Sequence, residues 1–514
     1  MLLDANLTED VPGDLSSEVV IVGAGTVGLY LAAALAEARK ASRIIVVEAG
    51  TTVASTSLNA LTSTTIGKPH EGVHLGRAAG LGGTSSLWGG QLAEFGQADL
   101  ERPDSAWPLS YEELKKCYRD VYRRLAIGSP ASTAFYRQKF GGETEEPGSL
   151  ERFFTYWLNQ PNLATLYKPL IQSNASVLVV VNLTATGCEF DGEHARFLRC
   201  TSSGGRNVLI RSRNFVFASG TVATSRFFLS TQKHDKVPWS FNRNIGLYFQ
   251  DHLGGKIARV SIVNESRFRD YFENGWVDGI RLQPKLTFSY TRRRALLSGA
   301  CGYFTFDSNL SANVANIKRT IHGVRSGLAF SSLTSCISDV VVVGRSIVPI
   351  VSRYIRKRRV FALWDRGLNL HVQAEQIPIA SSRIRLRGTE RAADGLIPVA
   401  VDWRCDGREL EAIYALAIES DAYLRRRGLA ELDIEPALQR RDAGFIDSLG
   451  DTYHQCGGMR MSAYRGAGVV GGDGRVWGTS NVWVAGAAVL PSSSHANCTL
   501  TALAIATRLL PGLE

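Results

Sequence analysis

The sequence predicts an α/β protein in which one domain, built on a parallel sheet, is interwoven with a second domain built on an antiparallel sheet with helices. Three observations support this prediction: a strand, glycine turn and helix within residues 19–35, alternating strands and turns within residues 370–403, and a short strand and a helix near residue 500. The 514 residues, 45% apolar and 21% charged, exclude a disulfide scaffold, a coiled coil and a disordered protein.

A glycine turn joins the first apolar strand to a helix. Residues 19–22 are apolar and β-branched, residues 29–35 form an Ala/Leu-rich helix, and the turn between them reads G-A-G-T-V-G. Such a turn brings backbone N–H groups against a pyrophosphate and lets strand and helix pack closely. A second strand at residues 43–47 ends at Glu48, which is placed to bind an adenosine ribose. We therefore predict a Rossmann-like dinucleotide site whose residues are Gly23, Gly25, Thr26, Gly28 and Glu48.

A second glycine-rich loop distinguishes between the two common dinucleotides. Residues 76–90 read G-R-A-A-G-L-G-G-T-S-S-L-W-G-G. A nicotinamide dinucleotide needs no second long glycine loop, whereas an extended FAD does, because its pyrophosphate, ribityl chain and ring continue through the protein. The sequence therefore predicts FAD, with contacts from Gly82, Gly83, Thr84, Ser85 and Trp88.

The C-terminal region supplies the groups for chemistry at the flavin. His454 stands shortly before a glycine pair, a short strand is predicted at residues 482–484, and a helix is predicted from Thr499, as its N-cap, to Leu510. A helix N-terminus directed at the flavin would stabilise the negative charge that appears on reduction.

In these motifs and their order the chain resembles the glucose-methanol-choline (GMC) flavin oxidoreductases, in a form like the bacterial pyranose and glycoside oxidases. The resemblance includes W-P-L-S-Y-E-E-L at residues 107–114 and the segment from Asn244 to Asp251-His252. It implies further FAD contacts at Val181, Gly486 and Thr499, although the family commonly has an acid where this chain has Gly486. It also implies two interwoven domains: an FAD-binding domain of residues 1–103, 172–254 and 450–514, and a substrate domain of residues 104–171 and 255–449 with a variable lid around residues 301–360.

The resemblance further implies a catalytic pair consisting of His454 and either His495 or Asn497. Asn497 is favoured because N-C-T-L-T at residues 497–501 aligns with the family's N-P-T-L-T. Oxidation of an alcohol sends a hydride to the flavin and needs a base for the hydroxyl proton; an imidazole can be that base and an amide can hold the oxygen. We therefore expect His454 to be the base and Asn497 the orienting donor. The alternative is that His454 is a hydrogen-bonded loop residue without catalytic work.

The substrate side is less defined by the sequence. Gln373 and Glu375 alternate on one predicted strand face and are candidates for binding a polyol. The expected activity is oxidation of a CH–OH group of a sugar, glycoside or polyol, with oxygen, a quinone or a carrier as electron acceptor. The alternatives are a dehydrogenase for a sterol, an aliphatic alcohol or a natural-product intermediate, and a flavoprotein without turnover that binds a membrane surface or a partner. FAD is expected to be non-covalent, because Leu87 stands where some pyranose oxidases attach it through histidine.

The net charge of +10 is mostly dispersed, which disfavours nucleic acid as a partner. One dense basic cluster (Arg353, Arg356, Lys357, Arg358 and Arg359) is expected to be a solvated helix face, with a peripheral membrane or partner contact as the alternative. The eight cysteines are far apart, so no metal site and no disulfide framework is expected. The first eighteen residues carry five acids and lack the pattern of a secretory signal, which favours a cytoplasmic location.

Overall fold

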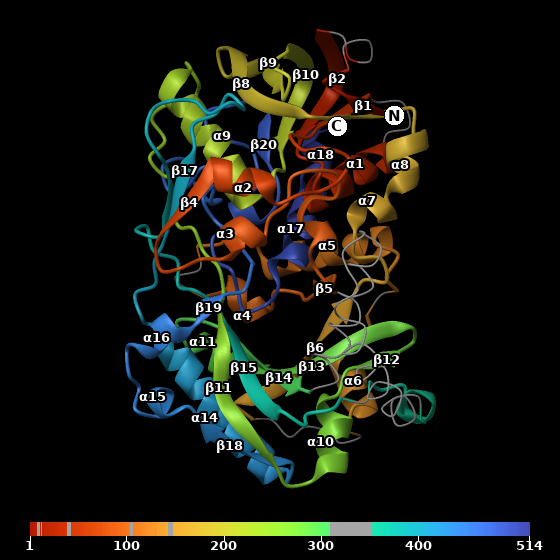
Figure 1. Cartoon of the computed structure of the whole chain (residues 1–514), viewed down its shortest axis with the longest axis vertical. Helices are drawn as coiled ribbons and strands as arrows, with labels where there is room; N and C mark the ends of the chain where they lie inside the picture. The colour runs from red at the N-terminus through yellow and green to blue at the C-terminus, as the bar shows by residue number, and fades with distance from the viewer. Residues whose placement is uncertain are drawn as a thin grey trace, which may run out of the picture.

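The computed structural model describes residues 1–513 apart from 8–10, 12, 39–42, 103–105, 129, 142–147, 309–351 and 361. In this described part the chain forms two large sheets and one small one. Figure 1 shows the mainly parallel sheet in the upper part of the molecule and the antiparallel sheet in the lower part. The chain passes repeatedly from one to the other, which confirms the predicted α/β class with two interwoven halves.

The mainly parallel sheet is assembled from three distant parts of the chain. Its strands lie in the order β1 (Leu2–Asp4), β7 (Val177–Val181), β3 (Ile44–Val47), β2 (Asp14–Val22), β10 (Asn207–Phe217), β9 (His194–Ser202) and β8 (Leu183–Asp191), and β20 (Val482–Val484) pairs with β10. The strand pairs of β10 with β2 and β20 are parallel, whereas β10 with β9 and β9 with β8 are antiparallel. Every residue of β3 and β7 is buried, which explains their uninterrupted apolar sequences.

Three long helices lie against this sheet or one another. α1 (Thr26–Ala38) follows the first glycine turn, α9 (Gly220–His234) follows β10, and α17 (Cys498–Arg508) packs against α1 and α5 (Tyr111–Arg124). α5 begins at the motif singled out in the sequence: Ser110 caps the helix, accepting a hydrogen bond from the Glu113 amide, and the Glu113 carboxylate bonds back to Ser110.

The antiparallel sheet lies in the order β18 (Ala430–Ile434), β11 (Leu253–Ile262), β15 (Gly367–Ala374), β14 (Ala300–Asp307), β13 (Ile280–Phe288), β6 (Leu150–Trp157) and β5 (Gln91–Leu92); β12 (Gly275–Val277) and β19 (Gly450–Asp451) pair with β13 and β11. The long helix α14 (Leu410–Arg426) packs against it. The remaining described elements are short: α2 (Ser57–Thr62), α3 (Gly72–Leu75), η1 (Gly83–Ser86), α4 (Gln97–Leu100), α6 (Thr133–Lys139), α7 (Leu163–Leu166), α8 (Lys168–Ser173), α10 (Glu265–Phe272), α11 (Tyr290–Arg294), α15 (Pro436–Gln439), α16 (Phe445–Ser448), η2 (Ala487–Val489) and α18 (Leu510–Leu513).

Two of the strands predicted within residues 370–403 belong to a different sheet from the one expected. β15 lies in the antiparallel sheet, but β16 (Arg383–Leu386) and β17 (Val399–Trp403) form a hairpin that pairs in parallel with β4 (Ser63–Gly67). The alternation that revealed the hairpin contains no information about β4, which lies more than 300 residues away in the chain. The hairpin itself was predicted correctly, and its partner was not.

The basic cluster at residues 353–359 is divided between the surface and the interior: Arg356, Lys357 and Arg358 are exposed, whereas Arg353 is half-buried and Arg359 is buried. Arg353 pairs with Asp270 and Glu273, and Lys357 pairs with Asp270. Arg359 is buried, with its guanidinium over the ring of Phe140. Only Arg356 and Arg358 of the five cations are exposed without such an ion pair. The expectation of a solvated face therefore holds for Arg356, Lys357 and Arg358, although acids of α10 and its C-terminal end pair with Arg353 and Lys357. The alternative of a membrane or partner contact stays a prediction.

The predicted lid around residues 301–360 falls mostly on residues 309–351, outside the described part of the chain. Its first residues are not a lid, because β14 is an inner strand between β13 and β15. None of the helices in the described ranges is both long and apolar enough to cross a membrane.

Candidate functional site

A cavity of about 500 Å³ lies where the carboxyl ends of several parallel strands meet. It is lined by the residues that end or follow β2, β3, β10 and β20, by the second glycine loop, by His454 and by the first turn of α17. In open α/β sheets this is the edge at which ligands bind.

The first glycine turn supplies one end of the cavity. Gly23, Gly25 and Thr26 line it, and α1 begins at Thr26. Gly28 does not line the cavity, because it packs the helix against the strand: a Cβ at this position would lie 1.8 Å from the Gly23 carbonyl oxygen. A Cβ on Gly25 would meet nothing nearer than the Gly83 Cα, at 3.9 Å. The two glycines therefore serve different purposes, as the motif predicts.

This difference gives a paired test. We expect Gly28→Ala to lower the free energy of unfolding by roughly 3 kcal/mol, because backbone must move to admit the methyl group. Gly25→Ala is expected to fold normally but to lose bound dinucleotide. Urea unfolding and the cofactor content of the purified protein measure the two effects, with Gly128→Ala at an open, exposed position as the control. Equal stability of Gly28→Ala and the control would contradict this account.

Glu48 lines the cavity at the end of β3, but its carboxylate also has internal partners. It accepts hydrogen bonds from the backbone amides of Ala24 and Gly50 and from Gly80, at 2.8 to 2.9 Å. Burial raises the pKa of Glu48, and these three donors oppose the shift. Glu48 thus ties both glycine loops to the sheet, a role in addition to the ribose contact predicted from its position.

The second glycine loop lies beside the first. Gly83, Thr84, Ser85 and Trp88 line the cavity, as does Leu87, whereas Gly82 does not. The Ser85 hydroxyl is used within the protein, donating to the Gly82 carbonyl and accepting from the Leu163 amide. Trp88 donates its indole N–H to the Pro161 carbonyl.

Val181 is also absent from the lining. It is a buried residue of β7, and the cavity is reached instead by three residues of the next strand, Leu183, Thr184 and Ala185. The FAD contact at Val181 stays a prediction that these lining residues do not support, because the chain turns between β7 and β8.

Two arginines in the cavity were not predicted. Arg226 forms a bidentate pair with Asp394. Arg77 donates to the Val73 carbonyl and the Ser63 hydroxyl, and within the described ranges no carboxylate pairs with it. Burial, followed by the charge of Arg226, lowers the pKa of Arg77 to about 10, so it remains charged at neutral pH. The G-R pair that opens the second loop was the available signal.

A cation without a counter-charge favours an anionic ligand such as a pyrophosphate. We expect Arg77→Gln to weaken FAD binding about tenfold. Titration of the apoprotein with FAD, followed by flavin fluorescence, measures the change. Arg211→Gln on the exposed face of β10 is the matched control, and FAD binding by Arg77→Gln equal to that of the control would refute the role.

His454 reaches the cavity from a strained loop. The preceding Tyr453 has a φ of 66°, and Gly457 has a φ of 82°. A Cβ at Gly457 would lie 2.0 Å from the Tyr248 carbonyl oxygen, which explains the glycine three residues after the histidine. Burial, and then the neighbouring His252, lowers the pKa of His454 to about 3. The imidazole is therefore neutral at physiological pH, as a proton acceptor must be.

A buried polar cluster holds this loop in place. The Asp251 carboxylate accepts the backbone amides of His454 and His252, and Thr452 donates to the same oxygen. Burial alone would raise the pKa of Asp251, but His70 at 3.1 Å and the other histidines nearby hold it below its usual value.

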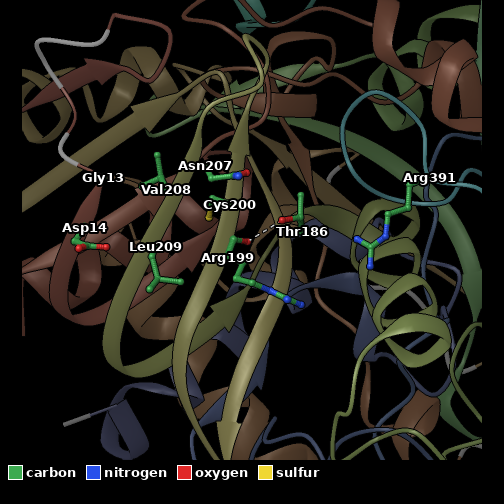
Figure 2. A pocket seen from close by; sticks show the side chains of 9 residues that line it. All are labelled: Gly13, Asp14, Thr186, Arg199, Cys200, Asn207, Val208, Leu209 and Arg391. Atoms are coloured by element: carbon green, nitrogen blue, oxygen red, sulfur yellow. Dashed lines mark hydrogen bonds between the residues drawn. The ribbon is translucent and has the colours of Figure 1, made fainter.

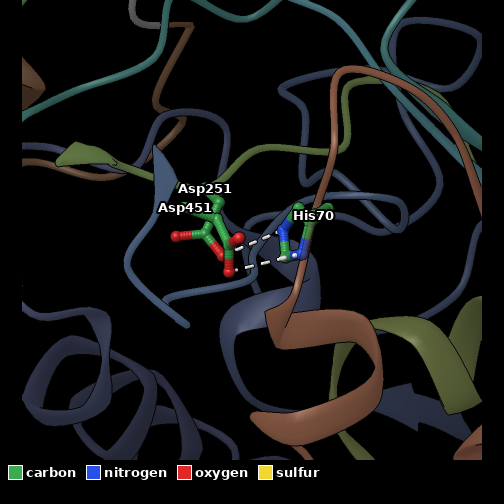
Figure 3. Close-up of side chains that lie close together, drawn as sticks. All are labelled: His70, Asp251 and Asp451. Atoms are coloured by element: carbon green, nitrogen blue, oxygen red, sulfur yellow. Dashed lines mark ion pairs between the residues drawn. The ribbon is translucent and has the colours of Figure 1, made fainter. Parts of the chain in front are cut away.

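Figure 3 shows the Asp251 and Asp451 carboxylates side by side, both facing the imidazole ring of His70. Their ligand atoms lie within 4.8 Å of one another, a grouping that the sequence did not predict. Asp451 accepts the amides of Glu71 and Gly72, and His70 Nδ1 accepts the Val73 amide. The cluster therefore joins the segment around α3 to the loop that carries His454.

Asn497 is the N-cap of α17, two residues before the predicted cap, Thr499. Thr499 instead lies in the first turn and lines the cavity together with Cys498. The Cys498 thiol lies 3.8 Å from the His454 carbonyl oxygen, so the helix start and the histidine loop are adjacent. Asn497 is buried and is not among the lining residues; its Oδ1 accepts from Gln373 at 3.4 Å.

His495 faces away from this arrangement. Its Nε2 lies 3.2 Å from the Thr287 hydroxyl and its ring meets Phe153 edge-on, next to Asp99. Like Asn497, it is absent from the cavity lining, so the lining does not distinguish the two candidates. Only Asn497 is the cap of α17.

The family model described as GMC oxidoreductase matches residues 378–506. The chain carries a GMC oxidoreductase domain. This confirms the resemblance expected from the motifs, and His454, Gly486, Asn497 and Thr499 all lie within the matched GMC domain.

Solved structures extend the likeness of fold to almost the whole chain. Pyridoxine 4-oxidase from Mesorbium loti matches 96% of this chain and 98% of its own, with a TM-score of 0.62 at 15% identity. An Aspergillus oryzae formate oxidase gives a TM-score of 0.58 at 13% identity over 98% of this chain and 99% of its own, and a fungal aryl-alcohol oxidase gives 0.58 at 15% over 97% and 98%.

A curated relative, the C-glycoside 3-oxidase of Microbacterium trichothecenolyticum, is 41% identical over 68 residues. The match spans 13% of this chain and 13% of the length of that relative.

The two proposed substrate residues lie outside the matched GMC domain and do not reach the cavity. Glu375 is fully buried and pairs with Arg102 at 3.0 Å and with Arg293 at 2.5 Å, and it accepts the Gly299 amide. Gln373 donates to the His495 carbonyl at 2.7 Å and to Asn497. The prediction of polyol contacts is corrected: both side chains are used to hold neighbouring segments, because their partners from other elements cover the strand.

Gly486, where the GMC family commonly has an acid, lines the cavity beside Val27. The groups around the cavity nevertheless fit an extended dinucleotide. The N-termini of α1 and α17 offer free amides at two places, the glycine at position 25 leaves room between the loops, and Arg77 supplies positive charge. FAD, bound there, would supply the hydride acceptor.

A second cavity, of about 480 Å³, lies on the outer strands β8, β9 and β10 (Figure 2). Arg199 and Arg391 line it, and both cations face Asp235, Arg199 at 2.8 Å. Neither glycine loop contributes to its lining, and His454 does not line it.

Proposed function

We propose that this chain is an FAD-dependent oxidoreductase that oxidises a CH–OH group of a sugar, glycoside or polyol, with His454 as the base. The observation that supports this most directly is that one cavity is lined by both glycine loops and by His454. A dinucleotide site and a neutral imidazole thus share one space, as hydride transfer coupled to proton removal requires.

In this proposal the chain's residues bind, orient and accept a proton. The amides at the start of α1 and the Arg77 guanidinium hold the pyrophosphate of FAD, and the start of α17 favours negative charge at the ring. His454 Nε2 takes the hydroxyl proton of the substrate, while Asn497, at the cap of α17, orients the substrate oxygen. Non-covalent FAD is proposed because Leu87 offers no nucleophile at the cavity wall. We also propose that the predicted domain boundaries separate the FAD-binding and substrate parts.

The sugar preference rests on the short match to a C-glycoside 3-oxidase. The test is anaerobic addition of sugars, C- and O-glycosides, polyols, aryl alcohols and sterols to the purified flavoprotein, followed by its visible absorption. We expect a sugar or glycoside to bleach the visible absorption of the flavin. If only another alcohol bleaches it, that alcohol defines the substrate class instead. Reoxidation in air, compared with reoxidation by a quinone dye, identifies the acceptor. No bleaching by any donor would refute the proposal.

A further inference from the structure

The His454 imidazole has two protein neighbours, both at the same ring nitrogen. Its Nδ1 lies 2.8 Å from the Thr452 hydroxyl and 3.0 Å from Nδ1 of His252, and the two rings are tilted by 60° with centroids 4.9 Å apart. Among the residues that the structure describes, none is hydrogen-bonded to His454 Nε2, which is thus left for a ligand in the cavity.

The protonation of His252 follows from its other nitrogen. His252 is fully buried, and its Nε2 lies 3.3 Å from the Ser493 carbonyl oxygen. A carbonyl oxygen only accepts hydrogen bonds, so Nε2 must carry the hydrogen. Burial lowers the pKa of His252, but the contacts with Cys498, Asp251 and the Ser493 carbonyl together raise it above its usual value. In the neutral form of His252 the single N–H is on Nε2, so Nδ1 carries a lone pair directed at His454.

Thr452 places the same requirement on His454. Its hydroxyl donates to the Asp251 carboxylate at 3.4 Å, which leaves an oxygen lone pair for His454 Nδ1. Asp251 can accept only, because its carboxylate also receives the amides of His252 and His454. His454 Nδ1 therefore faces two acceptors. The Ser493 carbonyl leaves His252 Nδ1 as one of them, and the Asp251 carboxylate leaves the Thr452 hydroxyl oxygen as the other.

We propose that His252 is a positioning residue whose Nδ1 lone pair, together with Thr452, holds His454 as the Nδ1–H tautomer, so that Nε2 is the proton acceptor in the cavity. This inference rests on the proposed role of His454 as the base. When Nε2 accepts the hydroxyl proton, Nδ1–H stays bound to His252 and no second proton moves. The Asp251 carboxylate, held behind the loop, stabilises the positive charge that His454 acquires.

The tautomer can be read directly in the intact flavoprotein. Solid-state ¹⁵N spectra of protein labelled at histidine distinguish protonated from unprotonated ring nitrogens, and subtraction of the His454→Gln spectrum identifies the His454 signals. The expected result is a neutral His454 with its hydrogen on Nδ1 and a neutral His252 with its hydrogen on Nε2. An Nε2–H form of His454, or a doubly protonated His252, overturns the inference without any further variant.

A matched pair of variants tests the cause. Both variants are made in a Thr452→Val background, which removes the hydroxyl acceptor at His454 Nδ1. The side chains introduced by His252→Asn and His252→Leu have similar branched shapes, but only Asn keeps an acceptor at the δ1 position. We expect the Asn variant to keep the Nδ1–H form of His454 and the rate of anaerobic flavin reduction of its background. The Leu variant is expected to lose the uniform tautomer and to reduce flavin about tenfold more slowly or less.

Three outcomes decide the inference. A tautomer of His454 that is the same in both variants refutes it, even if both are slow. If the Asn and Leu variants reduce flavin at equal rates although their His454 tautomers differ, the tautomer has no part in the reaction. If no alcohol reduces the flavin of the parent, the proposed function fails, but the spectra still decide whether His252 sets the tautomer.

Discussion

Replacement of His454 by Gln is expected to slow flavin reduction by about 10²- to 10⁴-fold, the range that a positioned general base contributes. Gln retains a polar group of similar length but cannot accept a proton at neutral pH, so FAD should remain bound with an unchanged visible spectrum. Stopped-flow reduction with the best donor from the alcohol panel measures the rate. His234→Gln, at an exposed histidine, is the control. A His454→Gln rate within a few-fold of that control would assign His454 a structural role only.

The same variant has a pH signature. Because burial lowers the pKa of His454 from 6.5 to about 3, the unfolded chain binds this proton at a higher pH than the folded protein does. The His454 contribution to stability is thus fully present above pH 6.5 and is lost as pH falls from there towards 3. The stability of His454→Gln should therefore depend less on pH than that of the parent across this window. Urea unfolding of both proteins at several pH values measures the difference.

Replacement of Glu375 by Gln is expected to lower the free energy of unfolding by roughly 3 to 5 kcal/mol, because two buried arginines lose the negative charge between them. Arg102 and Arg293 are almost fully buried, and Arg293 also pairs with Asp99. The measurement is urea unfolding, with Glu411→Gln in an exposed pair with Arg441 as the control, which should change stability by less than about 0.5 kcal/mol.

The catalytic parameters separate this structural role from the one predicted from sequence. If Glu375 only ties segments together, KM for the donor should stay within about twofold at a temperature where the variant is folded. If Glu375→Gln leaves the stability unchanged but raises KM strongly, Glu375 contacts the substrate as predicted from the sequence.

The parts of the fold that the sequence predicts well are those coded by neighbouring residues. The first glycine turn and the strand at residues 482–484 each depend on a few adjacent side chains, and the structure has them close to their predicted bounds. Pairings between distant segments were not accessible: nothing in the hairpin β16–β17 indicates that β4 is its neighbour.

The candidate site divides in the same way. His454 and most residues of the glycine loops were found because each motif is local and lines the cavity. Gln373 and Glu375 were misassigned because their partners, such as Arg102, come from segments between 76 and 273 residues away in the chain. His252 was singled out only as part of a turn, since its contact with His454 joins residues 202 positions apart.

The cavity takes its walls from both ends of the chain, with residues 22–27 on one side and residues 485–502 on the other. During synthesis, the first glycine turn leaves the ribosome long before its opposite wall exists. The cofactor pocket is therefore complete only once α17 has emerged and β20 has paired with β10. Pairing between such distant segments is slow to form, so apolar strands stay unpaired and exposed until the C-terminal region has been made. Supply of the cofactor to a refolding or newly made chain should consequently act at the last step of assembly, on the yield of finished protein.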